Sequence, residues 1–263
     1  MIDYRDVLRR VGYPESALIL DFETFFSRDY NLHKIEMTYD AFLADDQFEV
    51  LGMGFADPQV PLFAGPSGVQ LMLYAMQDSY GPNLERCTVV GHNLPFDALI
   101  LLEKYGIKPP YTIDTLDLAR HLDARGAHDL AYLAGKYGAP RPKGNTRQFL
   151  GLHAADMTPE HWTAMAEYCQ RDIEITTHLL SVMLPLITRP EAEIPLATQN
   201  LHAFLGRNVV IDRALGQSLE QEMLAEVEAA VSALHQYDLW VENPPKLTSR
   251  TCKPPEVRRP TLK

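Results

Sequence analysis

The chain has 263 residues and a formal net charge of −11, from 24 lysines and arginines against 35 aspartates and glutamates. It is 46% hydrophobic and 22% charged, a composition typical of a globular protein with a packed core. No apolar run approaches the roughly 20 residues of a membrane-spanning helix, and the polar residues 1–10 indicate no secretory signal. Three widely separated cysteines exclude a disulfide scaffold and a CxxC zinc site, so we expect a cytoplasmic protein without a membrane partner.

The charge is unevenly distributed along the chain. Residues 242–263 contain six basic and two acidic residues, a net charge of +4, so the remainder carries −15. Residues 136–147 form a second basic segment without an acid, and its cations are Lys136, Arg141, Lys143 and Arg147. The acidic total argues against broad electrostatic binding of nucleic acid, whereas this basic segment is either a solvated loop or a contact to a phosphate backbone.

Apolar runs and helix signals predict strands first and helices later. Strands are expected at 17–20, 48–55, 60–64, 88–90 and 112–115, and the last of these leads into a helix. Further helices are expected at 69–77, 95–105, 129–137, 158–186, 191–205 and 213–234. Gly106 and Gly138 are expected to end two helices, and Thr158-Pro159 to begin another. The proline-rich residues from 243 onward are typical of an irregular tail. This order indicates an α/β domain followed by a helical appendage.

Two carboxylates follow the first apolar run. Asp21 and Glu23 come directly after residues 17–20, and residues two apart on a strand point to the same face. A solvated strand end would explain such a pair by itself. The continuous apolar run favours a buried strand whose end opens into a site.

Two further acids occupy helical positions. Asp97 falls in the first turn of the helix at 95–105, where an acid commonly compensates the helix dipole, and Asn93 precedes that helix as a possible cap. Tyr168 and Asp172 are four residues apart, hence on one helix face, within an apolar stripe. Pairing of Asp172 with a basic residue elsewhere in the chain is the alternative explanation for its place there.

The four acids Asp21, Glu23, Asp97 and Asp172 could converge. Four unneutralised carboxylates would repel one another strongly, and hard divalent cations relieve that repulsion. Mg²⁺ and Mn²⁺ prefer oxygen ligands, and two such ions about 3.5–4 Å apart are a common arrangement for phosphodiester cleavage. We therefore predict a site for two ions, Mg²⁺ or Mn²⁺.

Three motifs in this order resemble those of the DEDD exonuclease superfamily. They are Asp21-x-Glu23, His92-Asn93-x-x-Phe96-Asp97 and Tyr168-x-x-x-Asp172. The tyrosine matches the DEDDy branch, because the position at which the other branch has histidine is Glu167. Asp21-Phe22-Glu23-Thr24, Phe48-Glu49-Val50-Leu51 and Asp114-Thr115-x-x-Leu118-Ala119-Arg120 are closer to the proofreading domain of family A DNA polymerases, especially those of phages. The resemblance covers residues 16 to 187.

The resemblance implies a ribonuclease H-like fold, a mixed five-stranded sheet with helices on both faces, and 3′–5′ removal of nucleotides. It implies that Asp21, Glu23 and Asp172 hold one metal ion, and that Asp21, with Asp97 through water, holds the other. Tyr168 would orient the attacking water. The expected contacts to nucleic acid are Thr24, Asn93, Lys143 and Arg147.

The resemblance divides the chain into three parts. Residues 1–187 would be the exonuclease domain, 188–241 a helical appendage similar to the linker and thumb start of such polymerases, and 242–263 a flexible basic tail. No palm or fingers motif is present. The chain is therefore a split polymerase subunit, a stand-alone exonuclease or a fragment, acting in bacterial or phage-infected cytoplasm.

The leading hypothesis is a 3′–5′ exodeoxyribonuclease that acts on single-stranded DNA or frayed 3′ ends. It would serve proofreading in DNA replication, with a separate DNA polymerase subunit as a possible partner. The alternatives are a 3′–5′ exoribonuclease and a non-catalytic module that binds single strands or docks to a polymerase.

Gly52-Met53-Gly54 lacks the third glycine of a dinucleotide fingerprint, so a dinucleotide site is not expected.

Overall fold

The computed structural model describes residues 3–32, 38–57, 60–206 and 212–235. The chain forms two compact units, residues 1–207 and 208–263. The predicted tail at 242–263 lies outside the described residues. Within the described residues, no helix is long and apolar enough to cross a membrane.

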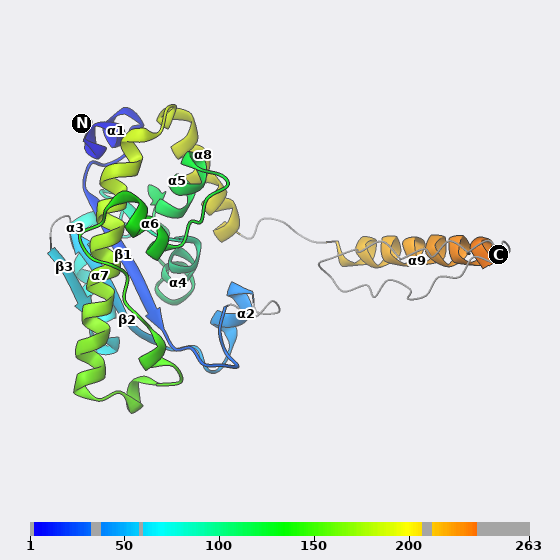
Figure 1. The fold of residues 1–263 in the computed structure, drawn as a ribbon, viewed down its shortest axis with the longest axis horizontal. Coiled ribbons are helices and arrows are strands. Elements are labelled where there is room, and N and C mark those ends of the chain that lie inside the picture. Colours follow the sequence, from blue (N-terminus) through cyan, green and yellow to red (C-terminus); the bar gives the residue numbers. More distant parts are fainter. Residues whose placement is uncertain (1–2, 33–37, 58–59, 207–211, 236–263) are drawn as a thin grey trace, which may run out of the picture. The chain divides into compact units, whose positions relative to one another are not determined.

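A mixed five-stranded sheet forms the centre of the first unit (Figure 1). Its strands are β1 (Ala17–Thr24), β2 (Val50–Asp57), β3 (Val60–Ala64), β4 (Thr88–Gly91) and β5 (Thr112–Asp114). Their order across the sheet is β3-β2-β1-β4-β5. The pairs β1–β2 and β2–β3 are antiparallel, whereas β1–β4 and β4–β5 are parallel. The predicted ribonuclease H-like sheet is confirmed, and β1 lies at its centre.

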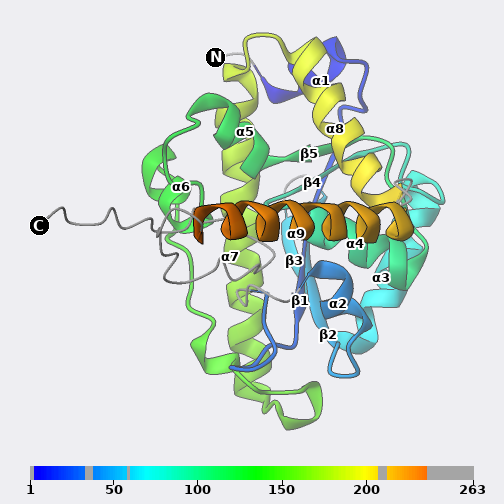
Figure 2. The same cartoon turned by 90° about the vertical axis from the view of Figure 1, so that its right-hand side faces the viewer.

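The side chains of β1 alternate between two hydrophobic clusters. Leu18, Leu20 and Phe22 belong to the cluster that contains residues of α3 (Pro66–Tyr80) and α4 (Pro95–Tyr105). Ala17 and Ile19 belong to the cluster on the opposite face. That face is covered by α7 (Pro159–Met183), with α5 (Thr115–Leu122) and α6 (Leu130–Tyr137) packed against α7. Figure 2 shows α7 on one side of the sheet and α3 and α4 on the other.

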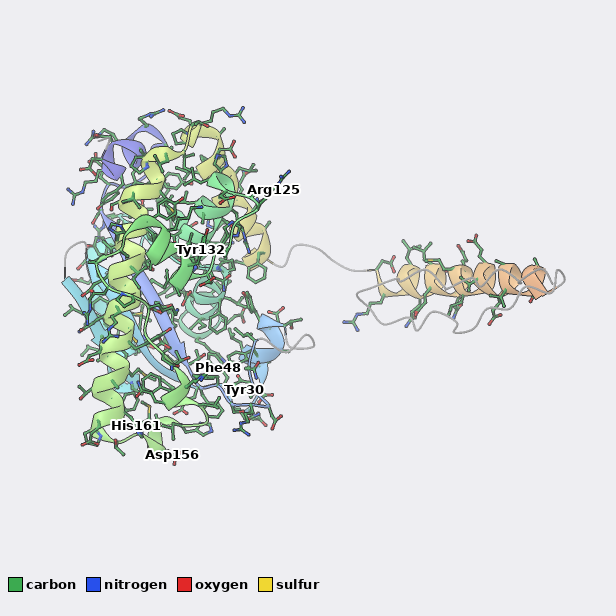
Figure 3. The ribbon with its side chains drawn as sticks, in the orientation of Figure 1. Tyr30, Phe48, Arg125, Tyr132, Asp156 and His161 are labelled. Atoms are coloured by element: carbon green, nitrogen blue, oxygen red, sulfur yellow. The ribbon has the colours of Figure 1, made fainter. Side chains whose placement is uncertain are left out.

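Local signals set the ends of several helices as expected. Gly106 and Gly138 both adopt the left-handed conformation, with φ of 68°, and follow α4 and α6. At the start of α7 the Thr158 hydroxyl accepts a hydrogen bond from the backbone N–H of His161, whose ring nitrogen accepts one from the Thr158 N–H. Figure 3 labels His161 at this end of α7. This reciprocal capping orients the long helix that carries Tyr168 and Asp172.

Two short helices were not predicted. Helix α1 (Tyr4–Arg10) is capped by Asp3 and buries Val7 and Leu8, and α2 (Tyr39–Ala44) buries Phe42 and Leu43. Beside α2, the rings of Tyr30 and Phe42 stack with centroids 4.2 Å apart, and Figure 3 labels Tyr30 and Phe48 there. Each helix has only six or seven residues, too few for helical periodicity to stand out in the sequence.

The first unit extends beyond the predicted domain boundary at 187. Helix α8 (Pro190–Gly206) packs against α4 and β5. Its Thr198 hydroxyl donates to the Thr112 carbonyl over 3.0 Å and accepts from the Tyr13 hydroxyl over 2.8 Å. These contacts make α8 part of the sheet-containing unit, so the helical appendage 188–241 does not form one separate body. The second unit contains α9 (Arg213–His235).

Candidate active site

Asp21 and Glu23 lie on the α7 side of β1, as the alternation predicts. Both side chains are partly buried, and the intervening Phe22 is buried on the opposite face. Across the β1–β2 pair, Asp21 is opposite Gly54 and Glu23 is opposite Gly52. Directly opposed residues share a face, so each carboxylate has a neighbour without a side chain. The Phe63 ring lies against Gly52, and helix α7 lies against Gly54.

Helix α7 approaches β2 closely at Gly54. A Cβ atom at this position would lie 3.0 Å from Cys169 Cβ and 3.1 Å from Ile173 Cγ1, both on α7. Cys169 Sγ in turn donates to Glu23 Oε1 over 3.4 Å. Gly54 therefore belongs to the architecture of the site, and the sequence indicated only a glycine pair within a strand.

Asp97 reaches β1 from the other side of the sheet. It is 3% exposed in the first turn of α4, and its Oδ1 accepts the Phe22 N–H over 2.8 Å. The β1–β4 pairing extends only through Ile19, so the Phe22 N–H lies beyond the reach of β4. Asp97 instead accepts this N–H, which belongs to the residue between Asp21 and Glu23.

A second aspartate organises the turn that leads to Asp97. The two oxygens of Asp114 accept the backbone N–H groups of Asn93 over 2.9 Å and Leu94 over 3.1 Å, and Oδ1 also accepts that of Leu116 over 2.8 Å. Asn93 has a left-handed φ of 64°, a conformation that asparagine tolerates better than most residues. The Asn93 amide also donates to the Tyr39 hydroxyl over 3.2 Å. Asp114 is thus the structural support of the β4–α4 turn.

Asp172 is buried, and only one of its two carboxylate oxygens has a hydrogen-bond partner. It is 3% exposed on α7, and its Oδ2 accepts a hydrogen bond from Lys143 Nζ over 2.8 Å. Its Oδ1 is buried without a hydrogen-bond partner. Pairing with a basic residue was the alternative explanation for this carboxylate, and the structure does contain that pair. One oxygen nevertheless remains unsatisfied, which is costly unless another ligand reaches it.

The acids influence one another electrostatically. Burial, followed by repulsion from Asp172, raises the pKa of Asp21 to about 7. Burial and the charges of Asp21 and Asp172 raise the pKa of Glu23 well above its usual value, and burial and Asp21 do the same for Asp97. Asp21 is thus the one carboxylate that interacts electrostatically with each of the other three.

Tyr168 faces the same cluster from α7. It is 7% exposed, and burial, followed by the charges of Glu23 and Asp172, raises its pKa well above that of a free tyrosine. The Phe149 ring lies edge-on to it with centroids 6.4 Å apart. The hydroxyl therefore stays protonated at neutral pH and is a hydrogen-bond donor beside three carboxylates.

The donor set suits a hard divalent ion. All four acids offer oxygen ligands, and the orphaned Asp172 Oδ1 is a ligand in need of a partner. In the arrangement shown, no group of three or more His, Cys, Asp or Glu among the described residues is placed to hold an ion. The Lys143 ammonium is the cation at Asp172. Metal binding would therefore require the carboxylates to draw together and Lys143 to move.

Residues 72–188 match the family model of 3′–5′ exonucleases. This part of the chain is therefore similar to a 3′–5′ exonuclease domain. This segment contains Asp97, Tyr168 and Asp172, whereas Asp21 and Glu23 precede it. No curated protein sequence matches the chain significantly.

Solved structures confirm the exonuclease fold. Trypanosoma brucei RNase D is 15% identical with a TM-score of 0.54, over 80% of this chain and 73% of that one. Brucella melitensis NrnC is 15% identical with a TM-score of 0.51, over 76% and 86%. A variant of the Trypanosoma brucei RRP6 catalytic core is 14% identical with a TM-score of 0.52, over 75% and 49%. The chain thus spans about half the length of the RRP6 core.

The predicted nucleic-acid contacts lie in different settings. Thr24 ends β1 after a register irregularity at Glu23, and Asn93 lies in the turn before α4. Lys143 lies at the acid cluster. Arg147 is exposed, and none of the contacts described for it reaches the four acids. The basic segment is therefore not one uniform cationic surface.

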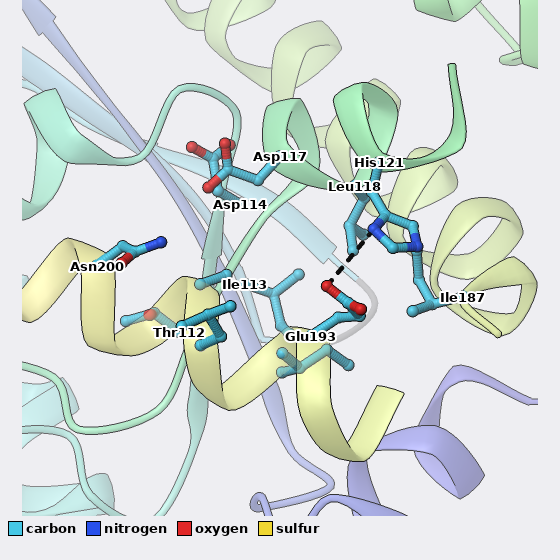
Figure 4. Close-up of a pocket in the computed structure, with 12 residues that line it drawn as sticks. Thr112, Ile113, Asp114, Asp117, Leu118, His121, Ile187, Glu193 and Asn200 are labelled. Atoms are coloured by element: carbon cyan, nitrogen blue, oxygen red, sulfur yellow. Dashed lines mark ion pairs between the residues drawn. The ribbon is translucent and has the colours of Figure 1, made fainter. Parts of the chain in front are cut away.

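A hollow of about 230 Å³ lies elsewhere in the first unit, between β5, α5 and α8 (Figure 4). Its polar side chains include His121 and Glu193, whose ring nitrogen and carboxylate are 3.7 Å apart. Asp114 also lines it, and its oxygens accept the turn N–H groups. This hollow is separate from the four acids, and its known contacts are structural.

The raised pKa of Asp21 predicts a pH dependence in the absence of metal. An acid whose pKa is higher in the folded than in the unfolded state contributes stability at low pH, and that contribution is lost as the pH rises to the folded pKa. We expect the melting temperature in EDTA to fall between pH 5 and pH 8, with Asp114, whose burial raises its pKa to about 7, acting in the same direction. Mn²⁺ affinity should rise over this window because the ion competes with protons. Thermal melts and metal titrations at each pH measure both trends, and a melting temperature that rises steadily to pH 8 would contradict the first.

Gly54→Ala tests the close approach of α7. The added Cβ would contact Cys169 and Ile173 at 3.0 and 3.1 Å, so we expect α7 to shift by a few tenths of an ångström and the cleavage rate to fall by about tenfold. The control is Gly135→Ala, since a Cβ at Gly135 in α6 meets nothing within 4 Å. Alanine should stabilise that helix slightly and leave cleavage unchanged. Equal activity of both variants would mean that Gly54 has no part in placing Asp172.

Proposed function

We propose that this chain is a metal-dependent 3′–5′ exodeoxyribonuclease that removes nucleotides from single-stranded DNA or frayed 3′ ends. The observation that supports the proposal is the mutual repulsion of the four acids: the charge of Asp172 raises the pKa of Asp21, and the charge of Asp21 raises the pKa of Glu23 and Asp97. The buried hydroxyl of Tyr168 is protonated in the field of the same acids. A binding module has no need of such a cluster, because mutually repelling buried carboxylates lower stability. A non-catalytic role is therefore disfavoured.

In this proposal each side chain has one task. Asp21, Glu23 and Asp172 would hold one Mg²⁺ or Mn²⁺, and Asp21, with Asp97 through water, would hold a second. When bound, such ions supply an activated water and neutralise charge that develops on the phosphate. The Tyr168 hydroxyl donates a hydrogen bond that orients the attacking water, which is the assignment of the DEDDy branch.

The strand itself would be held by residues around the cluster. Thr24 at the end of β1 and Asn93 before α4 flank the acids and are proposed to contact the terminal nucleotide. Lys143 and Arg147, on the loop before α7, are proposed to contact the phosphate backbone. Phosphate contacts of this kind position a strand and carry no sequence information.

DNA is the favoured substrate because the motifs are closest to the proofreading domain of family A DNA polymerases. An exoribonuclease is the second candidate, since the fold is shared with RNase D in complex with RNA U12 and with NrnC bound to pGG. Proofreading, a replication role, a phage source and a polymerase partner rest on the same resemblance. Co-purification with a polymerase subunit, together with loss of 3′ mismatch excision when this chain is omitted, would test the partner.

Matched oligonucleotides decide between the two substrates. Single-stranded DNA and RNA of one sequence, carrying the label at the 5′ end, would be digested with Mg²⁺ under single-turnover conditions. We expect a ladder that shortens from the 3′ end, faster for DNA, and no product when the 3′ end is blocked. Faster digestion of RNA would assign the chain to the exoribonucleases, and endonucleolytic products would overturn the proposal.

Removal of metal is expected to abolish cleavage. Without divalent ions the four acids repel both one another and the substrate phosphate, so EDTA should stop digestion and added Mg²⁺ or Mn²⁺ should restore it. A chelator selective for zinc should have little effect, because oxygen ligands favour harder ions. Undiminished digestion in EDTA would rule out a metal-dependent mechanism.

A further inference from the structure

The Lys143 ammonium is placed among the acids that are proposed to bind metal. Its Nζ lies 2.8 Å from Asp172 Oδ2, and it lies 5.5 Å from the Tyr168 ring centroid. Its positive charge also acts on Asp21 and Glu23, lowering the pKa of each against the larger effect of burial. One lysine thus interacts with the three carboxylates that are assigned to a single ion.

The next residue explains how the loop comes so close. A Cβ on Gly144 would lie 2.8 Å from Tyr168 Cδ2, closer than real Cβ atoms approach another atom. Any larger residue at this position would force the loop or the ring to move. The contact between Gly144 and Tyr168 holds the loop against α7 and directs Lys143 to the acids.

Neighbouring cations of the same basic segment behave differently. Lys136 Nζ is 2.8 Å from Asp123 Oδ2, and Arg141 lies 3.4 Å from Glu174. Both of their partners are more exposed, at 41% and 28%, against 4% for Asp172. Surface ion pairs of this type contribute little to stability. An ion pair with a buried carboxylate, by contrast, compensates a charge that would otherwise be unpaired.

We propose that Lys143 is the built-in counter-ion of the metal-free site, and that a divalent ion must displace its ammonium before the enzyme is active. This inference rests on the proposed metal-dependent function. The lysine and the ion seek the same oxygens of Asp172, so they cannot both be bound there. Lys143 stabilises the acid cluster between turnovers and thereby lowers the apparent affinity for metal.

Displacement itself can be observed by amine labelling. The full chain, stripped of metal, is treated with an acylating reagent with and without Mn²⁺, and the modification of each lysine is followed by mass spectrometry. Lys143 should be protected in EDTA and become several-fold more reactive with Mn²⁺. Lys136 is the internal control, because its side chain is 31% exposed against 30% for Lys143, at the same pair distance. Unchanged or lower Lys143 labelling in protein that has bound Mn²⁺ would overturn the proposal.

Competition is measured with Lys143→Met. In calorimetric titrations without nucleic acid, we expect this variant to bind Mn²⁺ about tenfold more tightly than the wild type, because no ammonium has to leave. Its melting temperature should be lower in EDTA and close to that of the wild type at saturating Mn²⁺, which also shows that it folds. Arg141→Met removes one positive charge from the same loop and should leave the affinity near that of the wild type.

The outcomes separate the two proposals. Equal or weaker Mn²⁺ binding by Lys143→Met, with normal binding by the wild type, refutes the counter-ion role and leaves the metal-dependent exonuclease intact. Equal tightening by Lys143→Met and Arg141→Met would show a general effect of loop charge and would also refute it. If the wild type binds neither Mg²⁺ nor Mn²⁺, both the counter-ion role and the proposed function fall.

Discussion

Asp21→Ala and Asp172→Ala are expected to abolish cleavage while differing in their effects on the stability of the metal-free protein. Either change removes an oxygen ligand from the proposed ion site. Bound metal supplies several kcal/mol of transition-state stabilisation, so the loss in rate should be on the order of 10³-fold or more. Single-turnover digestion with saturating Mg²⁺ measures this loss.

The melting temperatures of the two variants should differ in EDTA at pH 8. Asp21 is repelled by Asp172, and its pKa is raised to about 7, so its removal relieves strain and the melting temperature should stay the same or rise. Asp172 is the hydrogen-bonded partner of Lys143. Its removal leaves that ammonium without its closest acceptor, and the melting temperature should fall.

Glu174→Ala is the matched control. It lies two residues after Asp172 on α7, and its carboxylate pairs with Arg141 on the same loop as Lys143. This variant removes an ion pair between the same two elements without touching the cluster, so cleavage should persist. If Glu174→Ala is as inactive as Asp172→Ala, the loss of activity comes from the packing of the loop on α7. The proposed metal-binding role of the four acids would then be unsupported.

Tyr168→Phe is expected to lower the cleavage rate by about 10²–10⁴-fold, the usual contribution of one positioned acid–base group. Burial, followed by the charges of Glu23, Asp172 and Asp21, raises the pKa of the Tyr168 hydroxyl well above that of free tyrosine. It therefore cannot act as a base at neutral pH. Its contribution is to aim the water, so the variant should retain more activity than Asp172→Ala.

The phenylalanine variant isolates the hydroxyl. The ring, with its contacts to Phe149 and Gly144, is preserved, so Mn²⁺ affinity and DNA binding should barely change. Tyr132→Phe, at a tyrosine that is 44% exposed on α6, is the control and should match the wild type. If Tyr168→Phe has wild-type activity, the hydroxyl has no part in cleavage and the residue serves only to pack the core. A need for much more metal would instead give it a role in shaping the metal site.

Regular local patterns carried most of the fold prediction. All five strands and most of the helices lie where apolar runs and capping residues indicated. The predicted helix at 158–186 ends as α7 at Met183 and continues as a short 3₁₀ turn to Leu186. Spacing alone placed Asp21 with Glu23, and Tyr168 with Asp172. Such pairings depend on the period of a single strand or helix, and the sequence contains that period directly.

Contacts between distant elements were beyond the sequence. Pairing of Lys143 with Asp172 depends on the course of an irregular loop, for which no periodicity exists. The role of Gly54 follows only from the packing of α7 on β2. A glycine in a strand sequence does not indicate which element packs against it. Helix α8 looked like the start of an appendage, yet its hydrogen bonds to Thr112 and Tyr13 place it in the first unit.

The sequence by itself therefore determined which side chains could perform the chemistry and on which elements they lie. Only the tertiary structure decided that Asp97 reaches the Phe22 N–H from the opposite face of the sheet, and that a lysine is the cation at the buried Asp172. The physical reason is that secondary structure follows from interactions within a few residues. The field at a buried carboxylate, by contrast, is the sum of charges and donors brought together from the whole chain.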